Sequence, residues 1–176
     1  MAVSKETWQP ENDKEKIEYI FSEYKNLMFG KIFNIVKDRA LAETALIKSF
    51  RQIQKHIRKI DDPLSSRAAS FVVTVAKTCA LSALRIKTRD SGDADRDSGY
   101  DSHDIETALY EISAAEIITF VNKLGGVNKN IFLLKHAFGL SLSDIAEMLG
   151  DSAANVAARL QKAQRRLGAL IMRGGT

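Results

Sequence analysis

The residues of this sequence that are best suited to chemistry are typical of a binding surface. They do not form a group of catalytic residues. In residues 139–170, GLSLSDIAEMLGDSAANVAARLQKAQRRLGAL, one amide and four basic side chains recur at helical spacing: Asn155, Arg159, Lys162, Arg165 and Arg166. Arginine and lysine hold phosphate groups, and asparagine and arginine can hydrogen-bond the base edges in a DNA major groove. Residues 152–176 contain five basic residues and no acidic one, so we predict that this face binds DNA.

Two short helices joined by a turn are expected to position this face. Ser141 and Asp144 form an S-x-x-D pattern that is typical of a helix start. Ala146, Gly150 and Val156 then stand at offsets 0, +4 and +10, where a helix-turn-helix needs a small residue, a turn glycine and a branched apolar anchor. The alternative is an ordinary helical hairpin whose basic face is simply solvated.

Catalytic and metal-binding patterns are not found among the reactive side chains. His56, His103 and His136 are scattered along the chain, and Cys79 has no histidine or acid beside it in any motif. No glycine-rich phosphate loop follows a strand pattern. We therefore expect a protein that is not an enzyme and that needs no cofactor and no metal.

Composition favours an all-helical cytoplasmic protein. Of the 176 residues 45% are hydrophobic, only two are proline, and long runs are rich in Ala, Leu, Ile and Lys. The single cysteine, Cys79, rules out an internal disulfide and lies in an apolar helical pattern, so we expect it in a core. No apolar run is expected to approach the roughly 20 residues that cross a bilayer.

The periodicity of apolar residues predicts two small helical domains joined by a flexible acidic linker, with a helix-turn-helix in the C-terminal domain. Apolar residues at three- and four-residue steps indicate helices over residues 13–36, 40–60, 65–88, 104–124 and 128–138 before the helix-turn-helix. The expected domains are an arm at 1–12, a helical domain at 13–89, a linker at 90–103 and a second helical domain at 104–176.

Charge is distributed unevenly between these parts. Residues 63–89 contain five basic residues and no acidic one, as residues 152–176 do. Residues 90–111 between them contain eight acidic residues against Arg96 alone. Two basic helices separated by an acidic tether suggest a polyanion that is held at two places.

Taken together, the chain resembles the bacterial extracytoplasmic-function (ECF) sigma factors, the minimal two-domain initiation subunits of RNA polymerase. The stretch FLLKHAFGLSLSDIAEMLGDSAANVAARLQKAQRRL (132–167) follows that family's apolar helix, Gly-Leu-Ser start and Val-x-x-Arg-Leu recognition helix almost without gaps. AETALIKSF (42–50) lies where the family grips the polymerase clamp. FVVTVAKTCALSALRIKTR (71–89) lies where it melts the promoter and reads the −10 element.

This resemblance implies an alternative sigma factor that binds core RNA polymerase and directs promoter-specific transcription initiation. Its expected partners are the clamp of the largest polymerase subunit, promoter DNA and an anti-sigma factor, with no membrane insertion. Asn155, Arg159, Lys162, Arg165 and Arg166 would contact the −35 element. Lys77, Thr78, Arg85, Lys87 and Arg89 would contact the −10 element, near a base pocket at the 60–66 turn. Ala42, Glu43, Leu46, Ile47 and Phe50 would contact polymerase.

The sequence departs from the family pattern at several of these positions. Thr44, Ile47 and Lys48 stand where Asp, Gln and Glu are usual in the clamp-binding helix, and Thr78 stands where Asn is common. Gly125 replaces the usual Pro before the short helix. Asn155, Ala157 and Ala158 replace Thr, Lys and Ser in the recognition helix, so the base readout of this chain is expected to be unusual.

Two other functions are compatible with the patterns. A helix-turn-helix regulator that acts without polymerase explains residues 139–170 but gives no role to the basic helix at 65–89, and such regulators usually dimerise on palindromic sites. A sigma-like decoy that sequesters an anti-sigma protein explains the altered clamp-binding surface but needs no basic recognition face.

Overall fold

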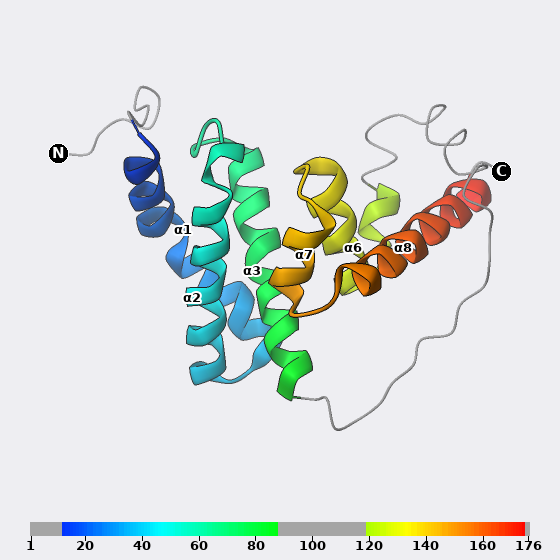
Figure 1. The fold of residues 1–176 in the computed structure, drawn as a ribbon, viewed down its shortest axis with the longest axis horizontal. Coiled ribbons are helices and arrows are strands. Elements are labelled where there is room, and N and C mark those ends of the chain that lie inside the picture. The colour runs from blue at the N-terminus through cyan, green and yellow to red at the C-terminus, as the bar shows by residue number, and fades with distance from the viewer. Residues whose placement is uncertain (1–11, 88–118, 175–176) are drawn as a thin grey trace. The chain divides into compact units, whose positions relative to one another are not determined.

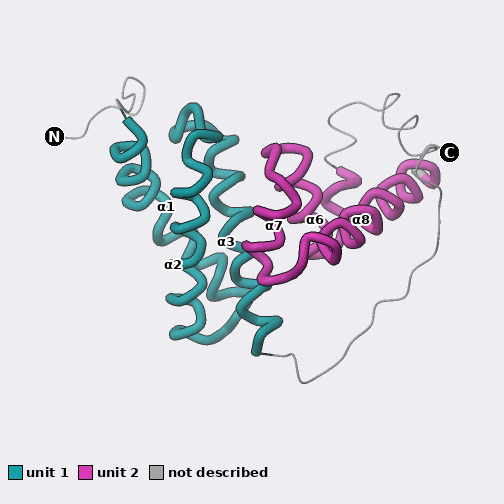
Figure 2. Tube along the Cα trace, in the orientation of Figure 1, with its two compact units in different colours: residues 1–89 teal, residues 90–176 magenta. Residues whose placement is uncertain are grey.

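A computed structural model describes residues 12–87 and 119–174, and within these ranges the chain is helical and has no strand (Figure 1). The predicted linker at 90–103, nearly all of the arm at 1–12 and most of the helix predicted at 104–124 lie outside the described residues. The chain divides into two compact units, residues 1–89 and 90–176 (Figure 2).

Unit 1 is a bundle of α1 (Asp13–Val36), α2 (Arg39–Lys55) and α3 (Ser66–Lys87), and each helix contacts the other two. The apolar residues that recur at three- and four-residue steps face inward, as the sequence pattern predicts. The largest fully buried side chains of this core are Ile20, Met28, Ile32, Ile53, Val72 and Val75.

The second helix of this bundle is shorter than the predicted 40–60 span. After Lys55 the chain changes to a 3-10 turn, η1 (Ile57–Lys59). Here the backbone N–H of Lys59 bonds the carbonyl of His56, and that of Ile60 bonds the carbonyl of Ile57. These tighter i→i+3 bonds end the α-helix, which the apolar spacing alone cannot distinguish from a continuation.

The loop between η1 and α3 is fastened to α1. The Tyr24 hydroxyl donates to the Pro63 carbonyl at 3.0 Å, and the Lys16 ammonium donates to the Ile60 carbonyl at 2.8 Å. Ser65 starts α3 because its hydroxyl accepts from the Ala68 N–H at 3.1 Å. The backbone of the 60–66 turn is therefore fixed by two contacts from α1 and by the cap of α3.

Helix α3 is long enough and apolar enough, by length and composition alone, to cross a membrane. The expectation that no apolar run approaches this length is therefore wrong. Half of the most apolar stretch of α3 is buried inside the protein, and the core helix of a soluble bundle has the same length and composition. The apolar character of α3 is accounted for by the core that it fills.

Unit 2 contains α6 (Gly126–Phe132), a π-helical turn η2 (Leu133–Ala137), α7 (Leu142–Leu149) and α8 (Ala153–Gly174). Both α6 and α7 pack against α8. The largest fully buried side chains are Ile131, Leu134, Leu140, Ile145, Met148 and Leu167. The short helix predicted at 128–138 thus consists of an α-helical and a π-helical part.

Candidate nucleic-acid interface

Helix α7 begins at the predicted serine cap. The Ser141 hydroxyl accepts from the Asp144 backbone N–H at 3.1 Å and lies 2.7 Å from Asp144 Oδ2, to which it donates. The cap satisfies one of the amide donors that a helix start leaves without a partner. This bond fixes where α7 starts relative to the turn that follows it.

The turn between α7 and α8 is a Schellman motif at Gly150. Gly150 has φ 62° and ψ 41°, a left-handed conformation that favours glycine. The Asp151 N–H bonds the Ala146 carbonyl at 3.0 Å, and the Gly150 N–H bonds the Glu147 carbonyl at 3.3 Å. The predicted role of Gly150 in a tight turn is confirmed.

Helix α8 starts at Ser152, whose hydroxyl accepts from the Asn155 N–H at 3.1 Å. Ala146 and Val156, the expected small residue and apolar anchor, are both buried. The buried side of α8 continues at helical spacing through Val156, Leu160, Ala163, Leu167 and Ile171. These residues confirm the predicted helix-turn-helix and determine which side of α8 faces outward.

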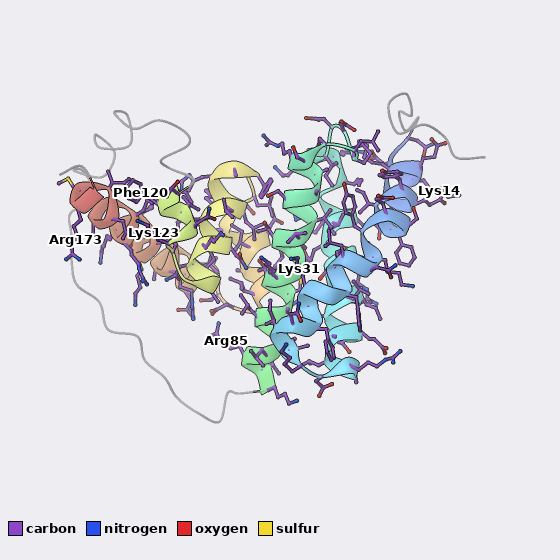
Figure 3. All side chains as sticks on the ribbon, turned by 180° about the vertical axis from the view of Figure 1, so that it is seen from behind. Lys14, Lys31, Arg85, Phe120, Lys123 and Arg173 are labelled. Carbon is purple, nitrogen blue, oxygen red and sulfur yellow. The ribbon has the colours of Figure 1, made fainter. Side chains whose placement is uncertain are left out.

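The predicted DNA-binding residues lie on the side of α8 away from this stripe. Asn155 and Arg166 are exposed, and Arg159, Lys162 and Arg165 are half-buried. Because residues three, four and seven apart share a helix face, the structure brings these five together. Arg173 extends from the last turn (Figure 3). Helix α8 contains five basic residues and no acidic one, a surface suited to a phosphate backbone.

Asp151 is a site residue that the sequence patterns identify only as part of a turn. Its Oδ1 accepts from Asn155 Nδ2 at 2.7 Å and from the Ser152 N–H at 2.8 Å. Its Oδ2 lies 3.9 Å from Nε of Arg159, and its side chain is only 5% exposed. The spacing of Asp151, Asn155 and Arg159, four residues apart in each step, is the signal that reveals this cluster.

One of the predicted −10 residues cannot contact DNA in this structure. Thr78 on α3 is fully buried, and its hydroxyl donates to the Thr74 carbonyl at 2.7 Å. The prediction that Thr78 binds DNA is therefore wrong, because its face of α3 packs into the bundle. Phe71 is also buried, as expected for a core residue.

The basic residues of α3 differ in their surroundings. Lys77 and Arg85 are half-buried, and the Arg85 side chain extends from the last turns of α3 (Figure 3). Lys87 Nζ lies 3.0 Å from Oδ2 of Asp38, the N-cap of α2. The Leu41 backbone N–H and then Lys87 lower the pKa of Asp38. Arg89, the last predicted −10 residue, lies outside the described residues.

The predicted polymerase-binding residues of α2 divide into an inner and an outer group. Ala42 and Leu46 are buried, so the prediction that they contact polymerase directly is wrong, and they act as core residues. Glu43 is exposed and pairs with Arg39 at 3.1 Å. Ile47 is 56% exposed and Phe50 is half-buried, so a partner can reach both.

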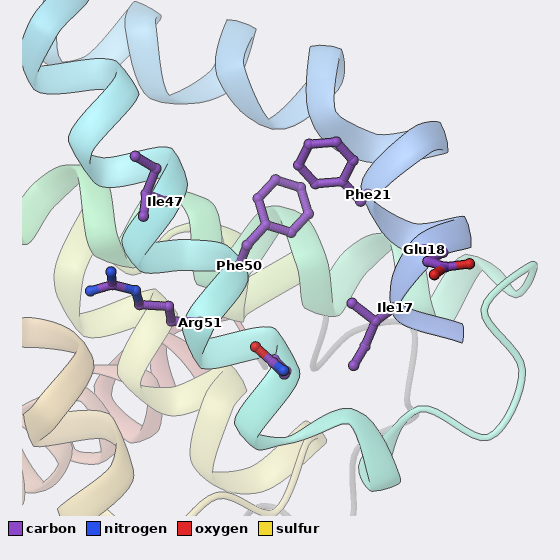
Figure 4. Close-up of a pocket in the computed structure, with 7 residues that line it drawn as sticks. Ile17, Glu18, Phe21, Ile47, Phe50 and Arg51 are labelled. Carbon is purple, nitrogen blue, oxygen red and sulfur yellow. The ribbon is translucent and has the colours of Figure 1, made fainter. Parts of the chain in front are cut away.

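Ile47 and Phe50 belong to an open apolar groove of about 510 Å³ between α1 and α2 (Figure 4). Phe21 on α1 is 46% exposed, and its ring centroid is 4.9 Å from that of Phe50. The groove is lined by Ile17, Glu18, Phe21, Ile47, Phe50, Arg51 and Gln54. The part of it on α1 is not identified by the clamp-helix pattern, because that pattern covers α2 alone.

Two other titratable groups, Cys79 and His136, have pKa values that burial shifts. Burial raises the pKa of the Cys79 thiol, which is fully buried as predicted. Burial also lowers the pKa of His136. The centroid of its ring lies 4.6 Å from that of the Phe132 ring.

Comparison with known families finds one that covers this site. Residues 114–167 match the family model described as Sigma-70, region 4. No curated protein matches the chain. The matched segment contains α6, η2, α7 and most of α8, so it includes the basic face and Asp151. The match shows that this segment of the C-terminal unit is similar to sigma-70 region 4.

Proposed function

We propose that the chain is an alternative sigma factor of the extracytoplasmic-function type, which binds core RNA polymerase and directs promoter-specific transcription initiation. The observation that carries this proposal is the acid-free basic face of α8, positioned by a capped helix-turn-helix inside the segment that matches sigma-70 region 4. In this proposal the protein acts in the cytoplasm by binding alone, without bond chemistry, cofactor, metal or membrane insertion.

At the −35 element, the basic face of α8 enters the major groove. Lys162, Arg165 and Arg166 bind phosphates, which position the protein without reading sequence. Asn155 and Arg159 lie nearest to the turn, at the N-terminal end of α8, where recognition helices contact base edges. An adenine for Asn155 and a guanine for Arg159 are the bases that these side chains recognise best.

At the −10 element, α3 supplies Lys77 and Arg85 to the single strand, and the 60–66 turn borders the base that is held out of the duplex. The bonds from Tyr24 and Lys16 support this role, because a backbone that is fixed in advance binds an unpaired base at lower entropic cost. Buried Thr78 shapes α3 from within the bundle.

Polymerase binding is assigned to the apolar groove between α1 and α2, with Glu43 on the exposed side of α2. Exposed Ile47 and Phe21 offer apolar contact area, and a groove of this kind accepts one face of a helix. The helical clamp of the largest polymerase subunit is the proposed occupant. An anti-sigma factor that covers the same groove would block that contact.

Ile47→Asp tests the groove. We expect this change to weaken association with core polymerase by about tenfold or more, because a charge replaces a central apolar contact. Fluorescence anisotropy with labelled core enzyme measures the effect. Ile86→Asp on α3 is the matched control, since Ile86 is a 67% exposed isoleucine that does not line the groove. Equal binding of both variants to core polymerase would mean that the groove is not part of the polymerase interface.

Reconstituted run-off transcription with core polymerase and genomic fragments tests the whole proposal. Discrete transcripts that require the chain support a sigma factor. A helix-turn-helix regulator is the second candidate, favoured by a family match that covers residues 114–167 alone. It predicts a palindromic footprint without polymerase and no transcript. A decoy predicts neither a transcript nor a footprint, and binding to an anti-sigma protein alone.

A further inference from the structure

Asp151 connects the turn of the helix-turn-helix to two side chains of the recognition face. The Asp151 side chain is only 5% exposed. Removing a carboxylate from water to this extent raises the free energy of the folded state unless hydrogen bonds and positive charge compensate for the lost hydration. Asp151 obtains these from the Ser152 N–H, the Asn155 amide and the Arg159 guanidinium. The three contacts are therefore part of how the turn folds, and they exist before any DNA is bound.

The contact with Asn155 fixes the orientation of its amide. An ionised carboxylate only accepts hydrogen bonds, so the NH₂ group of Asn155 must face Asp151 and its carbonyl oxygen must face elsewhere. An asparagine reads adenine with that oxygen and one amide hydrogen together. An amide that is already oriented loses less conformational freedom when it pairs with a base.

The contact with Arg159 acts on the neighbouring turn of α8. Nε of Arg159 lies 3.9 Å from Oδ2 of Asp151, an ion-pair distance that is too long for a hydrogen bond, so the carboxylate attracts the guanidinium and leaves its two terminal amino groups as the fork for a ligand. Because its side chain is 37% exposed, the fork can be reached from solvent. Asp151 thus contacts two planar donor groups, the Asn155 amide and the Arg159 guanidinium, which stand four residues apart on α8.

We propose that Asp151 is a positioning residue that sets the base preference of α8 by orienting Asn155 and Arg159. This inference rests on the proposed −35 role of α8. Asp151 brings a negative charge close to phosphates, so it opposes sequence-independent binding while it favours the correct bases. Its removal should therefore lower discrimination and leave non-specific affinity unchanged or higher.

The test measures discrimination by the full chain bound to core polymerase. The probes are a duplex recovered by the wild-type complex from a randomised pool and a scrambled duplex of equal length and composition. Asp151→Ala should lower the ratio of the two affinities about tenfold, the scale of one bidentate base contact, without weakening binding to the scrambled duplex. Asp151→Asn keeps an acceptor but loses the charge that faces Arg159, so an intermediate ratio is expected.

A double-mutant cycle separates positioning from a structural role. If Asp151 acts through Asn155, Asp151→Ala should change the ratio far less in an Asn155→Ala background than in the wild type. A purely structural or charge effect would be additive. Glu147→Gln, which removes an exposed acid from α7, controls for net charge and should leave the base preference unchanged.

The outcomes distinguish this inference from the proposed function. Failure of the wild-type chain to associate with polymerase, or to prefer any duplex, would overturn the proposed function. A wild-type preference that Asp151→Ala leaves intact, with the same bases recovered in a repeated selection, would overturn the inference alone. Thermal unfolding by circular dichroism checks that the variants fold. If Asp151→Ala unfolds, an unchanged ratio for Asp151→Asn overturns the inference.

Discussion

Helices α3 and α8 are alike in length and in the sign of their charge, yet they offer different surfaces. Each has 22 residues, and each contains basic residues and no acidic one. Helix α3 buries ten residues, among them the polar Thr74, Thr78 and Ser82. Helix α8 buries a single stripe, and its basic side chains share the opposite side.

The difference shows that the charge of a helix does not locate a nucleic-acid surface; the position of the charge relative to the buried stripe does. In α3, Arg85 and Lys87 stand in the last turn, where basic residues also stabilise the helix dipole. Lys87 is paired with Asp38. In α8 the charges continue along one face from Arg159 to Arg166. We therefore expect DNA binding to depend more on α8 than on α3.

Charge reversal on α8 should have the largest effect. Arg159→Glu with Arg165→Glu removes one proposed base contact and one proposed phosphate contact and adds two negative charges, so we expect duplex affinity to fall about 100-fold or more. Promoter-dependent transcription should be lost while core polymerase binding stays intact. Run-off transcription and anisotropy measure the two properties. Unchanged transcription would remove the −35 role of α8 and break the comparison.

Gly150→Ala tests whether the turn, and not charge alone, makes α8 a recognition helix. The left-handed conformation at Gly150 costs a residue with a Cβ about 1–2 kcal/mol. We expect unit 2 to lose that stability and α8 to bind duplex more weakly, with unit 1 unaffected. Thermal unfolding of the full chain measures the loss. A variant as stable as the wild type would mean that the turn relaxes without strain.

The matched reversal on α3 should have a smaller effect on duplex DNA. Lys77→Glu with Arg85→Glu changes charge by the same amount as the α8 variant, but we expect duplex affinity to fall less than about fivefold. The reason is that Lys77 and Arg85 stand eight residues apart on α3 with no basic residue between them, so they do not form one continuous basic face. Their effect should appear in promoter melting, which permanganate reactivity of unpaired thymines measures. Equal losses of duplex affinity from both variants would contradict the comparison.

The smallest expected effect concerns the pair that anchors the end of α3. The folded state lowers the pKa of Asp38, so this group stabilises unit 1 above its unfolded pKa of about 3.9, and the contribution is lost as pH falls through the lower folded pKa. Thermal unfolding between pH 6 and pH 3 should therefore show that the stability of Asp38→Asn falls less with acidification than the stability of the wild type. Identical pH profiles would mean that Lys87 is not anchored by Asp38.

The helix-turn-helix was predictable because its signals are local. Ser141, Gly150 and Val156 each act within a few residues, and the structure has the cap, the left-handed turn and the buried anchor at those positions. The inward positions of Thr78 and Ala42 were not predictable in this way. Their faces are decided by which neighbouring helix covers them, and a family pattern records the position without the packing.

Two other features depend on contacts that sequence spacing does not contain. Helix α2 ends at Lys55 because the backbone changes to i→i+3 bonds before the apolar pattern stops. The four-residue spacing of Asp151, Asn155 and Arg159 can be read from the sequence, but the 5% exposure of the Asp151 side chain, which shows that it is enclosed, comes from the structure alone. Burial of a polar group is the observation that separates a cap from a positioning residue.

The buried thiol of Cys79 allows the opening of unit 1 to be measured by chemical labelling. Only a thiolate reacts with alkylating reagents, and burial both raises the pKa of Cys79 and excludes the reagent. Modification must therefore wait until the three-helix bundle opens. Because the chain has one cysteine and it lies in unit 1, the labelling rate of the intact protein measures how often unit 1 opens.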